Sequence, residues 1–219
     1  MNTQRMRLVQ QFNKTMMVAF LSVGVLSGCQ QMPQWPGSSQ ESIATSPAPT
    51  NYPITPERRE LAKEIGALEG SNIRYYMDNQ EQALREQLRG SNIKVHRDGD
   101  VLRLEIPSQG SFAVGKSEIK AQLYPVLSTL AKVVSEYHKT MIVIIGHTDD
   151  SGSLAVNMQL SQQRADAVKS YLLTQQLDPR RLETHGEGPN YPVLPNTTAT
   201  NRAANRRVEI LLAPLTLGE

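Results

Sequence analysis

In this chain of 219 residues, an acid and an arginine, Asp149 and Arg164, have side-chain types and a spacing that could form a binding site. Residues 141–145 form an apolar, β-branched run of strand length that ends at a glycine and a polar cluster. Residues 154–175 then follow a helical pattern, with Arg164 on the face that continues into an apolar stripe. The carboxylate therefore leaves a strand end near a helix that carries a guanidinium, and ligands usually bind at such a mouth of an α/β unit.

Metal binding is one competing interpretation of this loop. The candidate ligands are His147, Asp149, Asp150 and, at a distance along the chain, His185. The His-x-Asp pattern is a weak signal, because the glutamate partners that usually accompany it at helical spacing are missing. We therefore expect no metal and no other cofactor.

Hydrolysis is a second competing interpretation. A hydrolase would need an activated nucleophile or a metal-bound water, and neither Ser151 nor Ser161 has an evident histidine partner. We therefore expect that the protein is not an enzyme. A third interpretation remains open from the spacing alone, in which Asp149 and Arg164 pair with each other and only fix the loop to the helix.

The elements that must position this pair are alternating strands and helices. Residues 93–96 and 101–106 alternate apolar and charged side chains around a turn signal, which predicts a hairpin. Residues 117–138 predict an amphipathic helix with a kink at Pro125. Further short elements are predicted at 182–186, 201–205 and 207–212. The fold class is therefore α/β with a mixed sheet, and the predicted core contains Ile144, Leu160, Val168, Leu172, Val208 and Ile210.

These residues also carry a family resemblance. Gly146-His147-Thr148-Asp149, a glycine three residues later, Asn157, Leu160-Ser161 and Arg164-Ala165 resemble the C-terminal domain of the OmpA family, as does 205–209, Asn-Arg-Arg-Val-Glu. Motifs between residues 75 and 90 also resemble small outer-membrane lipoproteins of this family. The resemblance covers roughly the last half of the chain. It implies an OmpA-like domain, an α+β sandwich in which a mixed β-sheet packs against helices.

The resemblance also implies a ligand, peptidoglycan of the diaminopimelate type, bound non-covalently. The diaminopimelate side chain ends in an ammonium and a carboxylate on one carbon. In the family the acid matching Asp149 and the arginine matching Arg164 hold this zwitterion. The chemistry fits, because a carboxylate can accept from the ammonium and a guanidinium can hold the carboxylate bidentately, which lysine does less well.

The remaining site residues follow from the same resemblance. The full implied ligand-binding set is Asp149, Arg164, Phe112, Ala113, Thr148, Arg206 and Arg207. One of the two neighbouring arginines is expected to contact the ligand and the other to be solvated or paired. Many relatives carry an acid in the loop that follows Phe112, where this chain has Ala113 and Gly115, so only backbone contacts are expected there. Asn157 is interpreted as a structural hydrogen-bonder between loop and helix.

Residues 1–28 are interpreted as a lipoprotein signal peptide. A basic start precedes the apolar or small-residue run at 15–26, which is too short for a comfortable membrane span. The run ends in Leu-Ser-Gly-Cys, and Cys29 is the only cysteine, so we expect lipidation of Cys29. An ordinary signal peptide with an incidental cysteine is the alternative. Since Gln30 follows, resemblance to lipoprotein sorting implies an outer-membrane anchor, with the protein facing the periplasm.

The chain between anchor and main domain divides in two. Residues 29–56 are rich in Pro, Ser and Gln and predict a disordered tether. Residues 57–90 predict two helices, a helical appendage to the OmpA-like domain at 91–214. The pair Tyr75-Tyr76 could stack on carbohydrate, but we interpret it as helix packing.

Two binding functions follow. The first is a tether between outer membrane and cell wall. The alternative is a regulatory module in the periplasm, whose appendage binds an unidentified envelope protein through an exposed apolar patch while the wall-binding domain positions it. The formal net charge of +2 gives no reason to propose nucleic acid as a partner.

Overall fold

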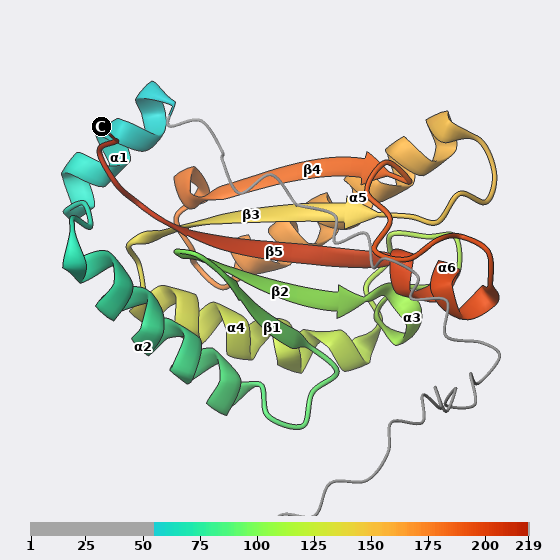
Figure 1. Ribbon diagram of the computed structural model, residues 1–219, viewed down its shortest axis with the longest axis horizontal. Helices are drawn as coiled ribbons and strands as arrows, with labels where there is room; N and C mark the ends of the chain where they lie inside the picture. The colour runs from blue at the N-terminus through green and yellow to red at the C-terminus, as the bar shows by residue number, and fades with distance from the viewer. Residues whose placement is uncertain (1–54, 219) are drawn as a thin grey trace, which may run out of the picture. The chain divides into compact units, whose positions relative to one another are not determined.

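The computed structural model of this protein describes residues 55–218 (Figure 1). The signal peptide, Cys29 and nearly all of the predicted tether lie outside the described residues. The helices are α1 (Pro56–Ile65), α2 (Ser71–Gln87), α3 (Ser108–Ser111), α4 (Tyr124–Glu136), α5 (Leu154–Thr174) and α6 (Ala199–Asn205), with short 3₁₀ turns at Ala121–Leu123 and Pro179–Arg181. The strands are β1 (Lys94–Asp98), β2 (Val101–Pro107), β3 (Thr140–His147), β4 (Leu182–Gly188) and β5 (Arg207–Pro214).

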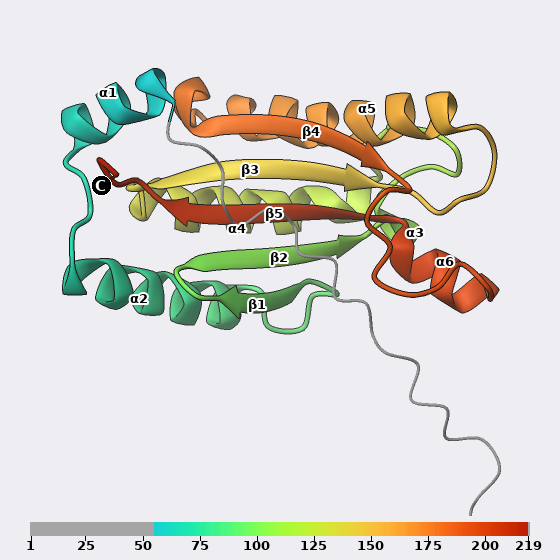
Figure 2. The same cartoon turned by 45° about the horizontal axis from the view of Figure 1, so that its top comes forward.

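The five strands form one mixed sheet in the order β1-β2-β5-β3-β4. Strands β3 and β4 pair in parallel, because α5 connects them, and every other neighbouring pair is antiparallel. Helices α2, α4 and α5 pack together against one side of this sheet (Figures 1 and 2). The predicted α/β class with a mixed sheet packed on helices is confirmed.

The main core lies between the sheet and the layer formed by α2, α4 and α5. Inward residues of β3 and β5 meet the apolar stripe of α5, so Ile144 and Val168 are fully buried. Of the predicted core residues, Val168, Leu172, Ile144, Val208 and Ile210 are confirmed. The prediction that Leu160 belongs to the core is wrong, since its side chain is only partly buried. The buried side of α5 at this level is polar, and it carries Asn157, Ser161 and Arg164.

The central strand β3 is buried along its whole length on both faces. On the face away from α4 and α5, Val143 and Ile145 of β3 join Leu211 of β5 and Val101 of β2 in a second apolar cluster. Helix α1 covers one end of this face, where Leu61 and Ala62 contact Met141. A strand buried on both faces is a continuous apolar run, which explains the pattern at 141–145.

Helices α1 and α2 correspond to the predicted appendage. Thr55 caps α1, as its Oγ1 accepts from the backbone N–H of Arg58 at 3.2 Å, and Pro56 occupies the first turn as predicted. Helix α2 places Met77 and Leu84 in the main core, and Leu88, which follows its last residue, joins them. Helix α2 therefore shares the main core of the OmpA-like domain, and α1 packs on that domain through the separate cluster with Met141. None of the helices between residues 55 and 218 is long and apolar enough to cross a membrane.

The predicted tyrosine pair divides between core and surface. The Tyr76 ring makes an edge-on contact with Tyr137, with ring centroids 5.4 Å apart, and its hydroxyl accepts from the Lys139 N–H at 2.9 Å. Tyr75 is 72% exposed. The packing interpretation is confirmed for Tyr76.

Pro125 does not kink a long helix. Residues 117–120 are not helical, and α4 begins at Tyr124, with the proline in its first turn. Proline suits that position because the first helical N–H groups have no partner within the helix. The segment before it pairs with the core edge instead, through a β-bridge between Ile119 and Phe112.

Two glycines allow α5 to lie directly on the parallel strands. A Cβ at Gly146 of β3 would lie 2.0 Å from the carbonyl oxygen of Ser161, and one at Gly186 of β4 would lie 2.4 Å from the backbone nitrogen of Gln162. Any larger residue would push the helix away. This close approach fixes the height of α5 on the sheet and so positions Arg164.

Candidate binding site

The loop between β3 and α5 is held by its own polar side chains. Asp149 Oδ1 accepts from the backbone N–H of Ser151 at 2.9 Å. Asn157 Nδ2 donates to the carbonyl oxygens of Asp149 at 3.3 Å and Ser151 at 3.0 Å. Ser153 caps α5 by accepting from Val156 N at 3.3 Å. Asn157 therefore makes the loop-to-helix contacts that were predicted for it.

Arg164 projects from α5 into the edge of the core and is only 4% exposed. Its Nε donates to the carbonyl oxygen of Lys116 at 3.0 Å. Its guanidinium carbon lies 5.4 Å from the centroid of the Phe112 ring, a cation–π distance. Its Nη1 is buried and has no hydrogen-bond partner among the described residues. The guanidinium is thus fixed by two neighbours and keeps the N–H donors of its buried Nη1 unused.

Asp149 pairs with an arginine that is distant from it along the chain. Its Oδ2 lies 2.5 Å from Nη1 of Arg206, the residue between α6 and β5. Within the described part of the chain, the ion pairs of Asp149 do not include Arg164. The interpretation in which Asp149 and Arg164 only pair with each other is therefore wrong.

The charges around Asp149 act on its pKa. Burial opposes ionisation, but the hydrogen bonds from Arg206 and Ser151 outweigh it and hold the pKa of the Asp149 carboxyl below its usual value. Burial lowers the pKa of the Arg164 guanidinium, the charge of Arg206 lowers it further, and Asp149 opposes both. Both residues are charged at neutral pH, because the pKa of Asp149 is lowered and because the guanidinium of an arginine is not deprotonated in proteins.

The two neighbouring arginines separate in the structure. Arg207 is 1% exposed and donates through Nε to Glu209 Oε1 at 2.7 Å and through Nη2 to the Tyr191 carbonyl at 3.2 Å. It is the paired arginine of the two, and its donors are used within the fold. Arg206 is the one that joins Asp149, with a side chain that is 37% exposed.

The remaining residues that the resemblance implied surround this group. Phe112 is buried beneath the Arg164 guanidinium. Ala113 is half-buried, and its N–H donates to Glu118 while its carbonyl accepts from Lys116. Thr148 donates its N–H to Gly188 at 2.9 Å, and its buried Oγ1 has no hydrogen-bond partner within residues 55–218.

Sequence reasoning missed two positioning contacts. The Lys116 carbonyl that orients Arg164 is a backbone group, so no pattern of side chains in the sequence could predict this contact. Ser161 Oγ accepts from the Gly188 N–H at 3.0 Å and donates to the Met158 carbonyl at 2.8 Å, so it joins α5 to the end of β4. Its place on the Asn157–Arg164 helix face was a signal that it faces the interior.

His147 is the last residue of β3 and lies on the same face of this strand as Val143 and Ile145, away from α5, because alternate residues of a strand share a face. Its Nε2 lies 3.8 Å from Glu209 Oε2. Burial lowers its pKa well below the usual value, and the charges of Arg207 and Arg103 add to this, so the imidazole is neutral at neutral pH. Within residues 55–218, no group of three or more His, Cys, Asp or Glu side chains lies close enough to hold a metal ion.

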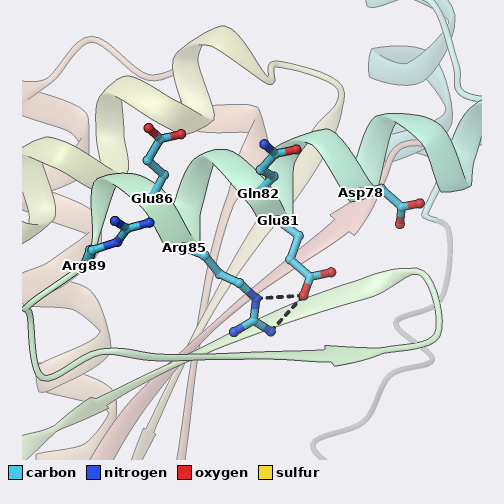
Figure 3. A pocket seen from close by; sticks show the side chains of 6 residues that line it. All are labelled: Asp78, Glu81, Gln82, Arg85, Glu86 and Arg89. Carbon is cyan, nitrogen blue, oxygen red and sulfur yellow. Dashed lines mark hydrogen bonds and ion pairs between the residues drawn. The ribbon is translucent and has the colours of Figure 1, made fainter.

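Helix α2 carries an open pocket of about 370 Å³ on its outer side (Figure 3). The lining residues are Asp78, Glu81, Gln82, Arg85, Glu86 and Arg89. All six of these side chains end in a polar or charged group, and two of them pair, as Arg85 donates to Glu81 at 2.7 Å. On the described surface of α1 and α2, Tyr75 is the one large apolar side chain that is exposed. The regulatory hypothesis predicted an apolar patch there, and a single tyrosine does not make one.

Known proteins resemble this chain in sequence and in structure. Residues 111–206 match the OmpA family. The probable lipoprotein YiaD of Escherichia coli K12 is 45% identical over 146 residues, which are 67% of each chain. The peptidoglycan-binding protein ArfA of Mycobacterium bovis is 37% identical over 98 residues, 45% of this chain and 30% of that protein. The chain thus spans two thirds of the first relative and under a third of the second.

The fold also has solved counterparts. The cell wall anchor of the type VI secretion system (T6SS) of Pseudomonas aeruginosa superposes with a TM-score of 0.56 at 27% identity. The match covers 62% of this chain and 96% of that one. The main domain of this chain is therefore similar to almost the whole of that structure.

Proposed function

Because this chain belongs to the OmpA family, we propose that it binds peptidoglycan non-covalently through the diaminopimelate side chain and, lipidated at Cys29, tethers the outer membrane to the cell wall. The observation that carries the proposal is the buried guanidinium of Arg164, whose Nη1 has no partner among the described residues and which lies near enough to the carboxylate of Asp149 for their charges to interact. The names of two similar proteins support this proposal, since one is a peptidoglycan-binding protein and the other is a cell wall anchor.

Burial is what makes Arg164 informative. Hydrogen-bond donors that are buried without a partner are costly, and Arg164 keeps such a donor although its fold contacts fix the rest of its side chain. A carboxylate at this position would satisfy the donor and offset the burial of the charge. Asp149 supplies the complementary acceptor for an ammonium. One cation and one anion at fixed places suit a zwitterionic head group.

The proposed activity is binding without catalysis. The roles given to Asp149 and Arg164 are to accept from the ammonium and to hold the carboxylate, and neither role breaks a bond. The hydroxyl of Ser161 is used between α5 and β4, and the neutral His147 faces a different cluster. A nucleophile and a base within hydrogen-bond reach are what an acyl-transfer site would need.

A sedimentation experiment tests the proposed function. Purified sacculi of the diaminopimelate type should carry the wild-type protein into the pellet, and Asp149→Ala should remain mostly in the supernatant. Asp150→Ala is the matched control, because Asp150 is the exposed acid next in the chain and should pellet like wild type. Equal pelleting of the wild type and Asp149→Ala would contradict the proposal.

The anchor has a separate test. Cys29→Ser removes the only thiol in the chain, so the precursor should be neither lipidated nor cleaved normally. We expect membrane fractionation to show that this variant is lost from the outer membrane, where several acyl chains on one residue would hold the wild type stably. Unchanged recovery of Cys29→Ser in the outer membrane would mean that the protein is not held there by a lipid on this residue.

A further inference from the structure

We propose that Arg206 sets the ligand specificity of this site, by occupying the carboxylate of Asp149 until a ligand supplies both an ammonium and a carboxylate. The proposal rests on the proposed function and goes beyond it. In this role Arg206 changes its partner when the ligand binds. The ligand ammonium takes the place of Arg206 on Asp149, and Arg206 then pairs with the ligand carboxylate.

The contacts of Asp149 show why an exchange is needed. Oδ1 already accepts from the Ser151 N–H, and Oδ2 is held by Arg206 Nη1. Both oxygens are therefore engaged within the protein. Each oxygen can accept a second hydrogen bond, but an ammonium beside Oδ2 would be repelled by the charge of Arg206, which favours moving this guanidinium aside. The side chain of Arg206 is 37% exposed, so solvent and ligand can reach it.

The charges show what the displaced arginine requires. The site contains two guanidiniums, Arg164 and Arg206, and one carboxylate, Asp149. Arg206 is close enough to Arg164 for its charge to act on that residue. If an ammonium takes Asp149 and brings no anion, three cations share one carboxylate, and like charges in a partly buried site repel. A ligand carboxylate that lies between the two guanidiniums returns the site to the single excess positive charge that it has without ligand.

The exchange therefore discriminates between ligands in two ways: it favours a ligand that carries the carboxylate, and it disfavours one that lacks it. A diaminopimelate side chain brings the ammonium and the carboxylate together, so that each cation in the site has a carboxylate beside it. A lysine side chain brings only the ammonium, so it must break the Asp149–Arg206 pair without giving Arg206 a new partner. Without Arg206, the lysine side chain would find Oδ2 of Asp149 unoccupied.

Calorimetry with two muropeptides tests this role of Arg206. The probes are a diaminopimelate-containing tripeptide muropeptide and its lysine counterpart, titrated into the full-length wild-type protein, Arg206→Ala and Arg206→Gln. We expect the wild type to prefer the diaminopimelate peptide. In both variants, affinity for the lysine peptide should rise severalfold and affinity for the diaminopimelate peptide should fall, so that the preference shrinks at least tenfold.

The control is Arg202→Ala. Arg202 is a cation on the neighbouring α6 and donates to the Asn196 carbonyl rather than to Asp149, so its removal should leave the preference unchanged. Equal loss of affinity for both peptides in the Arg206 variants would overturn the inference while leaving the proposed function intact. Failure of the wild type to bind the diaminopimelate peptide would overturn both.

Discussion

Val168→Asp is expected to unfold the domain. Val168 is fully buried in the main core, where α5 packs against the sheet. An aspartate there would bury an unpaired carboxylate among apolar side chains, and such changes are among the most costly single substitutions. A loss of more than about 4 kcal/mol is a large part of the stability of an ordinary domain, which is about 5–15 kcal/mol.

A thermal melt followed by circular dichroism measures this effect. Gln163→Asp is the matched control, because Gln163 lies on the exposed side of the same helix. We expect Val168→Asp to show no cooperative transition, or one that is shifted far down, and Gln163→Asp to melt close to the wild type. A melt of Val168→Asp that overlays the wild type would mean that the face of α5 is wrongly assigned.

Asp149→Ala and Arg164→Ala should each weaken binding of a diaminopimelate-containing muropeptide by about 1.5–3 kcal/mol, the size typical of hydrogen bonds to charged groups. This corresponds to roughly a ten- to hundredfold change in the dissociation constant. The Asp149 variant loses the acceptor for the ammonium and also leaves Arg206 without its partner. The Arg164 variant loses the guanidinium that holds the ligand carboxylate.

The two losses should not add in the double variant, since both residues hold the same head group. Calorimetric titration of the wild type, both single variants and the double variant measures the coupling directly. Each protein is first checked for an unchanged fold by its circular dichroism spectrum. If both single variants are folded and bind as tightly as the wild type, the wall-binding site lies elsewhere on the molecule.

Local patterns were sufficient to predict most of the fold. The alternation at 101–106 predicted β2, and the apolar stripe through Val168 and Leu172 predicted the buried face of α5. Errors arose where one residue type suits two positions. Pro125 fits a helix start as well as a kink, and the sequence pattern does not say which. Leu160 continues the stripe, but the helix there turns polar residues inward.

The site was predicted only in part, because its contacts join distant parts of the chain. Asp149 and Arg164 came from one motif, but 57 residues separate Asp149 from Arg206, and the pair of adjacent arginines gave no sign of which one points to the loop. The structure separates the two arginines. Arg207 is the first residue of β5, and its buried guanidinium donates to Glu209 two residues later, whereas Arg206 pairs with Asp149. The orientation of Arg164 depends on a backbone carbonyl, that of Lys116, which side-chain identity does not reveal.

The central claim is that the ligand head group sits between Asp149 and Arg164. Nuclear magnetic resonance of ¹⁵N-labelled protein, titrated with the diaminopimelate muropeptide, tests it most directly. We predict saturable shifts of the Arg164 Nε–H signal, whose hydrogen is now donated to Lys116, and of the Ser151 amide, which is bonded to Asp149. Saturable binding that leaves both of these signals unmoved would contradict the account.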